Sequence, residues 1–523
     1  MWDKSVINRR EFARAAGLIA AATVASKLLG FVRESVIAAR FGASGLTDAY
    51  VVAQTVPNLV WLVVGTALST TVVPAYTAEH VRDPRRATQL YSSLMILVSA
   101  GTLLLAALMW GLTAPMIRLI APGFPEERMA LAVHLTRILL PMMFFLSVGA
   151  ILTGVEQAHR RFTLPALAPV WQNLVVIASV LFLSGRLGIE AAALGLVVGT
   201  LAQTLAQLPG MRGLGRFRWS VDLGQPALAD VGRLMTPVLL GMVVVQLSPV
   251  INRMLGSNLP PGSISALNYA NLLFMLPTGL FTAAISTVLY PELSDRVARE
   301  DEGGALRLTR RGLDLGLLIG LPVALLMIVL GVPVVRFLFE HGAFDAHATR
   351  MTALGLAMYA AGLPAATTQD VLRRTYYARQ DTRTPMAVNI GGVAVTILLS
   401  FLLVGPMGLG GLALAATVAT WVQTLWLAAV LPGLHQALAG EAGKWLRILL
   451  ASLAMTALDA AWARWAGVPG PGTGLLHQAL WLAVAGLLSA AAYGGALWLL
   501  RVPEVGELLS AGRRLWARRL AAS

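Results

Sequence analysis

The sequence predicts an all-α polytopic membrane protein with about fourteen transmembrane helices. Hydrophobic residues make up 57% of the 523-residue chain and charged residues only 13%, while the mean hydropathy is +0.72. A soluble protein of this length needs more polar surface than that. The apolar residues also form continuous runs, rather than the alternating pattern that is typical of membrane strands.

The apolar runs follow one another along the whole chain, and the polar stretches between them are too short for a soluble domain. Many Gly, Ala and Ser residues within the runs allow helices to approach closely in lipid. We expect spans roughly at 14–38, 47–75, 88–118, 130–156, 165–184, 189–209, 232–256, 263–290, 312–339, 349–372, 385–404, 409–432, 446–466 and 477–500.

The basic residues predict how the spans are oriented. Most of the 40 Lys and Arg residues lie in the two termini and in every second loop, as in the clusters at 82–86, 296–311 and 373–383. Loops rich in Lys and Arg stay on the cytoplasmic side, so both termini are predicted to be cytoplasmic. This distribution explains the net charge of +14, and nucleic-acid binding is not expected.

The first predicted span begins like a signal peptide, with basic residues ahead of an apolar run. The run continues through Gly30 to about Ala39, which is longer than the apolar part of a signal peptide. We therefore expect an uncleaved first helix.

Two pairs of segments match at similar offsets and indicate an internal repeat. "ALSTTVVPAY" (67–76) aligns with "AISTVLYPEL" (284–293), and "QAHRRFTLPALAPV" (157–170) aligns with "YARQDTRTPMAVNI" (377–390). Two parallel six-helix lobes are the expected result, and such lobes usually hold a substrate between them and rock around it. The predicted parts are residues 1–220, residues 221–440, and residues 441–523 with two further helices and a basic cytoplasmic tail.

The first helix carries charges inside its apolar run, at Lys27, Arg33 and Glu34. An intramembrane cation costs about 2.5–3.5 kcal/mol, so it is expected to face water, a partner or an anionic ligand. Lys27 and Arg33 are six residues apart and do not share a narrow stripe of the helix. The alternative is that Arg33 and Glu34 extend to the membrane surface and leave only Lys27 buried.

The same region resembles the first two helices of the MurJ (MviN) family, which are bacterial lipid II flippases of the multidrug/oligosaccharidyl-lipid/polysaccharide exporter superfamily. The resemblance rests on "SKLLGFVRES" (26–35), "FGA" (41–43), "TDAY" (47–50) and "PN" (57–58). It continues in order to about the twelfth helix through "RFTLPALAPVWQN" (161–173), "FLFEHGAFD" (337–345) and "YYARQDTRTP" (376–385).

The resemblance implies a V-shaped pair of lobes around a cationic cavity, which lipid II enters from the inner leaflet. Its diphosphate is expected near Lys27 and Arg33, with Ser26 and Asn173 lining the cavity. Lys27 stands where the family usually has Arg, and it keeps the charge but lacks the planar fork that grips phosphate. Arg253 is expected either to add a cation to this site or to reach the headgroups from a helix end.

Two segments depart from the family pattern. The family commonly has basic residues just after the Pro-Asn of its second helix, whereas this chain reads "PNLVWLVVG" (57–65). The eighth helix of the family usually carries an Asp-Arg pair and a nearby Glu, whereas this chain reads "YANLLFMLP" (269–277). A less cationic cavity is expected, and transport of another polyprenyl-diphosphate glycan remains an alternative.

Glu34, Asp48, Asp370 and Arg374 are the candidates for gating or for charge pairing. Asp48 is expected either to stabilise the first turn of its own helix or to pair with Arg33 or Lys27 in one state of the carrier. Asp370 lies four residues before Arg374, the spacing of an ordinary ion pair along a helix. A role in a gate is the alternative for this pair.

No cofactor, metal site or catalytic centre is expected. The chain has no Cys, its 7 His residues are scattered, and it lacks an HExxH motif and a Gly-rich phosphate loop. Some family members have a sodium site with acids in the seventh and eleventh helices, but "TPVLLGMVVVQLSPVIN" and "MAVNIGGVAVTILL" contain none. We expect the membrane potential to bias the empty carrier instead, by about 2.3 kcal/mol per charge per 100 mV.

The predicted function is movement of lipid II between the leaflets of the bacterial cytoplasmic membrane by alternating access, in peptidoglycan and cell-wall biogenesis and cell shape. The chain is expected to be a monomer in contact with membrane lipids, and not an enzyme. A cation-coupled drug exporter of the same superfamily is less favoured, because those proteins typically have twelve helices and buried acids. A membrane enzyme that uses the same lipid should have acids or histidines in a surface loop, where residues 340–345 are only a modest candidate.

Overall fold

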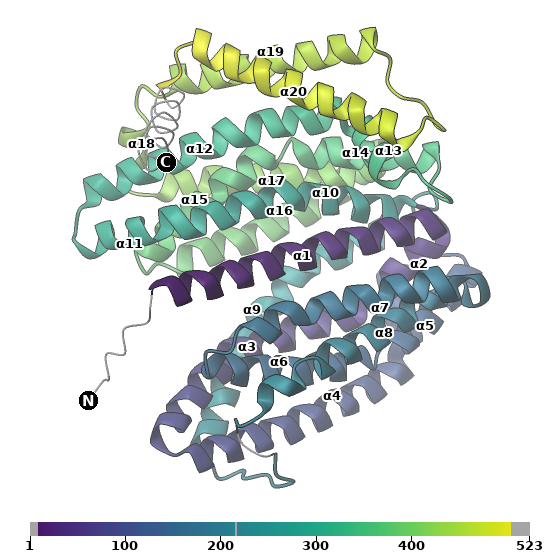
Figure 1. Ribbon diagram of the computed structural model, residues 1–523, viewed down its shortest axis with the longest axis vertical. Helices are drawn as coiled ribbons and strands as arrows, with labels where there is room; N and C mark the ends of the chain where they lie inside the picture. Colours follow the sequence, from purple (N-terminus) through teal and green to yellow (C-terminus); the bar gives the residue numbers. More distant parts are fainter. Residues whose placement is uncertain (1–8, 215–216, 504–523) are drawn as a thin grey trace. The chain divides into compact units, whose positions relative to one another are not determined.

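The computed structural model describes residues 9–214 and 217–503, and that part of the chain is helical and contains no strand (Figure 1). The helices, with η1 a 3₁₀ turn and η2 a π segment, are α1 (Arg9–Phe41), α2 (Gly45–Ala53), α3 (Thr55–Arg82), α4 (Pro84–Ile120), α5 (Glu126–Leu139), α6 (Met142–Ala158), α7 (Thr163–Leu187), α8 (Glu190–Leu205), η1 (Leu208–Met211), α9 (Pro226–Gly256), α10 (Ser263–Ala284), η2 (Ile285–Leu289), α11 (Tyr290–Ala298), α12 (Glu302–Val329), α13 (Gly331–Phe339), α14 (Ala346–Ala360), α15 (Leu363–Ala378), α16 (Arg383–Met407), α17 (Leu409–Val430), α18 (Leu434–Ala437), α19 (Ala442–Trp465) and α20 (Leu475–Leu499).

Every predicted span lies on one helix or on consecutive helical segments. Within the described residues, 10 helices are long and apolar enough to cross a membrane. The predicted all-α polytopic membrane fold is therefore confirmed. The first span is helical throughout, because α1 passes Gly30 without a break. The predicted basic ends of the chain fall largely on residues 1–8 and 504–523, outside the described residues.

Several predicted spans are interrupted, and a proline follows each interruption closely. Proline lacks the backbone N–H that a helix interior needs, but it is tolerated in the first turn of a new helix. The prolines at these breaks are Pro57 in α3, Pro141 before α6, Pro291 in α11, Pro333 in α13 and Pro364 in α15. Several long apolar runs therefore consist of two consecutive helical segments.

The chain divides into two compact units, one of residues 1–265 with 342–344 and one of residues 266–341 with 345–523. In the first unit α7 packs along α1 and α8, and α3 packs along α6 and α9. In the second unit α16 packs along α17, and α12 packs along α15 and α19. The added helices α19 and α20 lie side by side (Figure 1). The lobe boundary at residue 220 and the internal repeat stay predictions.

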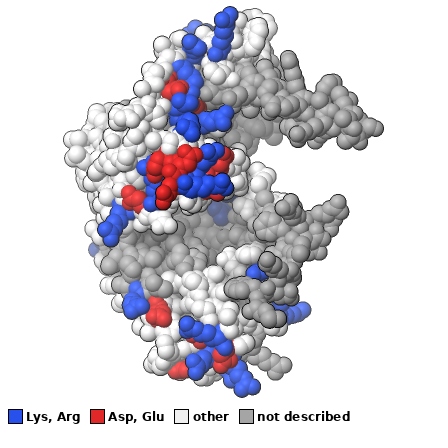
Figure 2. Space-filling model, turned by 90° about the vertical axis from the view of Figure 1, so that its left-hand side faces the viewer, with Lys and Arg blue, Asp and Glu red and all other residues white. Residues whose placement is uncertain are grey.

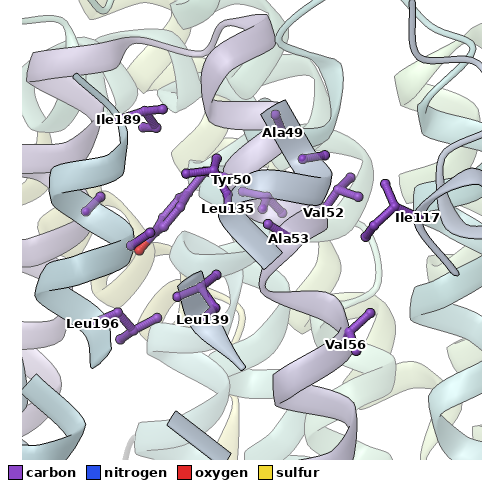
Figure 3. Close-up of a cluster of buried hydrophobic side chains, with 14 of the residues drawn as sticks. Ala49, Tyr50, Val52, Ala53, Val56, Ile117, Leu135, Leu139, Ile189 and Leu196 are labelled. Atoms are coloured by element: carbon purple, nitrogen blue, oxygen red, sulfur yellow. The ribbon is translucent and has the colours of Figure 1, made fainter. Parts of the chain in front are cut away.

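The core of the first unit surrounds Tyr50, which is buried (Figure 3). Its side chain extends from α2 toward Leu139 of α5 and Leu196 of α8 (Figure 3). In lipid, such side chains hold helices together by close van der Waals packing. This core fixes α2 next to the end of α1, the helix that carries the predicted site.

Two glycine motifs of the first unit meet at the end of α1. The backbone N–H of Ala343 donates to the carbonyl of Ala39 over 2.7 Å. Gly42 has a φ of +69°, and a Cβ atom there would lie 2.5 Å from the carbonyl oxygen of Ala343. Gly342 has a φ of +60°, and its Cβ atom would lie 2.2 Å from the carbonyl oxygen of Ala39. Only glycine fits at these two positions, so the glycines of "FGA" and "HGAF" allow the two segments to pack against each other.

Candidate functional site

Arg33 of α1 is the centre of a charged cluster in the first unit. Its Nε and Nη2 atoms donate to Oε1 of Glu34 over 3.1 and 2.7 Å, and its Nη1 atom donates to Oδ1 of Asn173 over 3.1 Å. The side chain of Arg33 is 24% exposed and that of Glu34 17%. Neighbouring residues of a helix do not normally face each other, so the guanidinium bends back along α1 to reach this carboxylate.

Asn173 of α7 connects two points on α1. It accepts from Arg33 and donates through Nδ2 to the carbonyl oxygen of Ser26 over 3.2 Å. A Cβ atom on Gly30 would lie 3.8 Å from the Asn173 amide, so this glycine faces the same contact. Asn173 is buried, and its amide therefore fixes the rotation of α1 against α7. The structure brings together Ser26, Arg33, Glu34 and Asn173, although Ser26 takes part through its backbone.

Lys27 and Arg253 take part in none of the described hydrogen bonds of this cluster. Lys27 is exposed on α1, and no described residue makes a hydrogen bond or ion pair with it. That agrees with the expected turn of the helix between residues 27 and 33. Arg253 is half-buried in the last turn of α9, and its side chain also has no hydrogen bond or ion pair among the described residues. Both cations therefore keep their donors available for another group.

Asp48 is buried at the start of α2, where it binds the turn before α10. Its Oδ2 atom accepts from the backbone N–H of Gly262 over 2.6 Å, and its Oδ1 atom accepts from the N–H and hydroxyl of Ser265, each over 2.8 Å. A carboxylate at this position satisfies N–H groups that a helix start leaves unpaired. In this structure Asp48 pairs with neither Arg33 nor Lys27, and it caps another helix rather than its own.

The expected ion pair between Asp370 and Arg374 does not form. The guanidinium of Arg374 lies over the ring of Tyr290, with Cζ 5.5 Å from the ring centroid. Oδ2 of Asp370 is buried and has no hydrogen-bond partner among the described residues. An ion pair along a helix contributes only about 0.3–0.5 kcal/mol, and a cation over a tyrosine ring contributes a similar amount. The aromatic ring on α11 therefore competes with the local carboxylate and holds Arg374.

Tyr50 is a residue of this region that the sequence analysis did not single out. It lies within electrostatic range of both Arg33 and Glu34, and its ring is part of the core described above. The signal was present in "TDAY", where Tyr50 follows Asp48 by two residues. The motif therefore contributes Asp48, which caps a neighbouring helix, and Tyr50, whose aromatic ring lies beside the charged cluster.

The cluster around Arg33 suits an anion better than a metal ion. Arginine offers five N–H donors in a planar fork that matches phosphate geometry. Among the described residues, one carboxylate contacts this fork, and it does so through a single oxygen atom. The described residues contain no group of three or more His, Cys, Asp or Glu residues placed to hold a metal ion. A phosphate group that replaced Glu34 would keep Arg33 paired and leave its contact with Asn173 unchanged.

Comparisons with known proteins place the chain among bacterial membrane transporters. The profile of the family described as Lipid II flippase MurJ matches residues 37–483. A relative from Burkholderia cenocepacia, named lipid II flippase MurJ, is 32% identical over 498 residues, which cover 91% of this chain and 95% of the relative. A relative from Rhizobium meliloti, named probable lipid II flippase MurJ, is 32% identical and covers 79% of each chain.

The solved structures agree with these relatives. A structure described as lipid II flippase MurJ in an inward closed conformation is similar with a TM-score of 0.77 and 26% identity, over 92% of this chain and 99% of that one. An inward-facing multidrug transporter of the MATE family and MOP superfamily has a TM-score of 0.62 at 12% identity, over 79% and 93% of the two chains. That likeness shows a shared fold alone. Because the family profile and relatives of at least 30% identity cover most of its length, the chain belongs to the lipid II flippase MurJ family.

Proposed function

We propose that the chain moves lipid II, the lipid-linked peptidoglycan precursor, from the inner to the outer leaflet by alternating access. The observation that carries the proposal is Arg33, a half-buried cation in a predicted membrane span that is held by one carboxylate and one amide. The names of its relatives support the same substrate. All three nitrogen atoms of Arg33 donate to these two partners, and the carboxylate is the partner whose charge a diphosphate can replace.

Glu34 acts as the partner of Arg33 when the site holds no substrate. Its carboxylate neutralises the guanidinium, which lowers the cost of keeping a cation within a membrane span. A diphosphate offers more oxygen atoms and more negative charge than one carboxylate, so it competes for the same N–H groups. Asn173 keeps the guanidinium in place during this exchange, and Lys27 and Arg253 add positive charge elsewhere in the first unit. Asp48, Asp370 and Arg374 are proposed to change partners between states.

The chain works as a monomer with both termini in the cytoplasm, without enzymatic activity and without a bound sodium ion. The membrane potential then biases the return of the cationic empty carrier.

The orientation is testable directly because the chain contains no cysteine. Single cysteines introduced at Arg85 and at Glu127 should react with a membrane-impermeant maleimide from opposite sides of the membrane. Reaction of both from one side would contradict the proposed topology.

Complementation tests the substrate and the site together. A strain depleted of its own lipid II flippase should grow when it expresses the wild-type chain, but not when it expresses Arg33→Ala at the same level. Arg186 is an exposed cation on α7, so Arg186→Ala is the matched control and should support growth. Failure of the wild type despite correct insertion would contradict lipid II as the substrate, and rescue by Arg33→Ala would contradict the site.

A second candidate function is transport of another polyprenyl-diphosphate glycan. It is favoured by the segments that lack the family's usual charges, because Leu62 in α3 and Met275 in α10 have large exposed apolar side chains there. Neither position offers a charged contact to a transported lipid. Binding of lipid II and of undecaprenyl diphosphate without a glycan to the purified chain separates the two functions. Equal affinity for both lipids would support the second candidate.

A further inference from the structure

The second unit contains a cavity of about 650 Å³ that the proposed transport site does not use. It lies where the turn before α19 meets the first turns of α12. Six cations line it: Arg296, Arg307, Arg310, Arg311, Lys444 and Arg447. Figure 2 shows the face on which α11 and α18 lie, where basic side chains gather in several groups together with acidic ones.

The inner part of the cavity is already neutral. Asp314, which is buried, accepts from Lys444 Nζ and from Trp445 Nε1, the latter over 2.8 Å. Glu441 forms ion pairs with Arg310 over 3.0 Å and with Lys444 over 2.6 Å. Two carboxylates are therefore matched by two cations, and this network needs no further arginine for its own stability.

The rim of the cavity keeps additional positive charge. Arg307 and Arg447 both line it and both are exposed. Neither forms a hydrogen bond or ion pair with any described residue, although Arg307 lies within electrostatic range of Asp301. Their N–H donors are therefore free to bind a ligand that supplies negatively charged oxygen atoms.

The position of the cavity restricts what that ligand is. Five of its six cations lie in the first turns of α12 and α19, two helices long and apolar enough to cross a membrane, and the sixth, Arg296, lies in α11. Basic side chains at the start of a membrane span lie at the level of the lipid headgroups. Basic pockets between membrane helices on the cytoplasmic side bind anionic headgroups.

We propose that this cavity binds the phosphate of an anionic phospholipid headgroup, such as phosphatidylglycerol, through Arg307 and Arg447. The bound lipid is a resident of the membrane and not the transported substrate. Its phosphate joins α12 to α19, and therefore fixes the two added helices against the rest of the second unit.

The test measures lipid binding to the full chain in neutral detergent by native mass spectrometry. Phosphatidylglycerol should bind more tightly than phosphatidylcholine, and Arg307→Gln with Arg447→Gln should weaken its binding about 30-fold. Binding of phosphatidylcholine, whose choline group offsets the phosphate charge, should change much less. The matched control is Arg85→Gln with Arg218→Gln, which removes two exposed arginines from the first unit and should change the affinity by no more than about twofold.

Melting temperatures in neutral lipid establish that both double variants fold. Unchanged phosphatidylglycerol binding by the Arg307/Arg447 variant would overturn the proposal, and so would an equal loss in the control. Competition with inorganic phosphate distinguishes a lipid ligand from a soluble anion. If phosphate displaced phosphatidylglycerol from the wild type at the same concentration as free lipid, the ligand would be a soluble anion and the lipid assignment would be wrong. Complementation by Arg33 variants is a separate readout, so this proposal and the transport function fail independently.

Discussion

The two charged clusters of the molecule both pair cations with carboxylates, but they differ in how many charged groups hold one another. In the second unit Asp314 and Glu441 together receive Lys444, Arg310 and the indole of Trp445. In the first unit Arg33 is held by Glu34 through one oxygen atom and by Asn173. The second network joins two carboxylates to two cations and stabilises the fold, whereas Arg33 depends on a single carboxylate that an anionic ligand can replace.

The two clusters also differ in what happens when one partner of an ion pair is removed. Asp314 is 2% exposed, so its charge is largely shielded from solvent and depends on Lys444 for neutralisation. Arg33 is 24% exposed, so loss of Glu34 leaves the guanidinium partly solvated. Removing a partner should therefore damage stability in the second unit and alter ligand binding in the first.

The largest effect is expected from Lys444→Met. This change leaves the carboxylate of Asp314 buried with Trp445 as its remaining side-chain donor, which should lower the free energy of unfolding by about 3–5 kcal/mol. Denaturant unfolding in detergent measures the loss. Adding Asp314→Leu removes the stranded charge and should restore most of the stability. A double variant as unstable as the single one would contradict the account of this network.

Asn173→Ala should have the next largest effect. It removes a partner from Arg33 and from the carbonyl of Ser26, and each unsatisfied group costs about 1–3 kcal/mol when it is buried. Because Arg33 is partly exposed, the loss of stability should lie at the low end of that range, while transport falls strongly. Asn173→Asp keeps an acceptor for Arg33 and should retain more of the fold's stability. Full transport by Asn173→Ala, measured by complementation, would show that transport does not need the hydrogen bonds of Asn173 between α1 and α7.

Glu34→Gln should leave the fold nearly unchanged and strengthen anion binding. A partly exposed ion pair contributes about 0–1 kcal/mol, and its loss frees Arg33 Nε and Nη2 for phosphate. The affinity of the purified protein for undecaprenyl diphosphate should rise by up to about fivefold. Calorimetry of wild type and variant gives this comparison, and weaker binding by the variant would mean that Glu34 helps the ligand instead of competing with it.

The smallest expected effect is the pH dependence of the stability that Glu441 contributes to the second unit. The hydrogen bond from Lys444 lowers the pKa of Glu441, and the charge of Arg310 acts in the same direction. Since the pKa is lower in the folded than in the unfolded chain, the stabilisation is present above the usual glutamate pKa and is lost as the pH falls through the folded value. Melting curves of wild type and Glu441→Gln should therefore differ near neutral pH and converge in acid. A gap that widened in acid would contradict this assignment.

The helices could be predicted from the sequence because each span carries its own signal, a run of apolar residues of sufficient length. The breaks inside the spans were not predicted, although Pro141, Pro291 and Pro364 are visible in the sequence. A proline in an apolar run is compatible with a kink, a π segment or two separate helices. Packing against neighbouring helices decides among these outcomes, and a local pattern does not contain that information.

The candidate site could be predicted only where a resemblance supplied long-range information. Arg33 and Asn173 are 140 residues apart in the chain, and no spacing rule connects them. The pair of Asp370 and Arg374 was predicted from local spacing and was wrong, because Tyr290 from another helix holds the arginine. The contact between Asp314 and Lys444, 130 residues apart, was not predicted for the same reason.

The central claim is that Arg33 is kept available to receive the diphosphate of a lipid-linked glycan. The most direct measurement is the affinity of purified wild type and Arg33→Gln for lipid II, determined by native mass spectrometry, with Arg186→Gln as the control. We predict that Arg33→Gln binds lipid II at least tenfold more weakly, since a charged hydrogen bond contributes about 1.5–3 kcal/mol. Equal affinity of wild type and Arg33→Gln, with both proteins folded, would contradict the account.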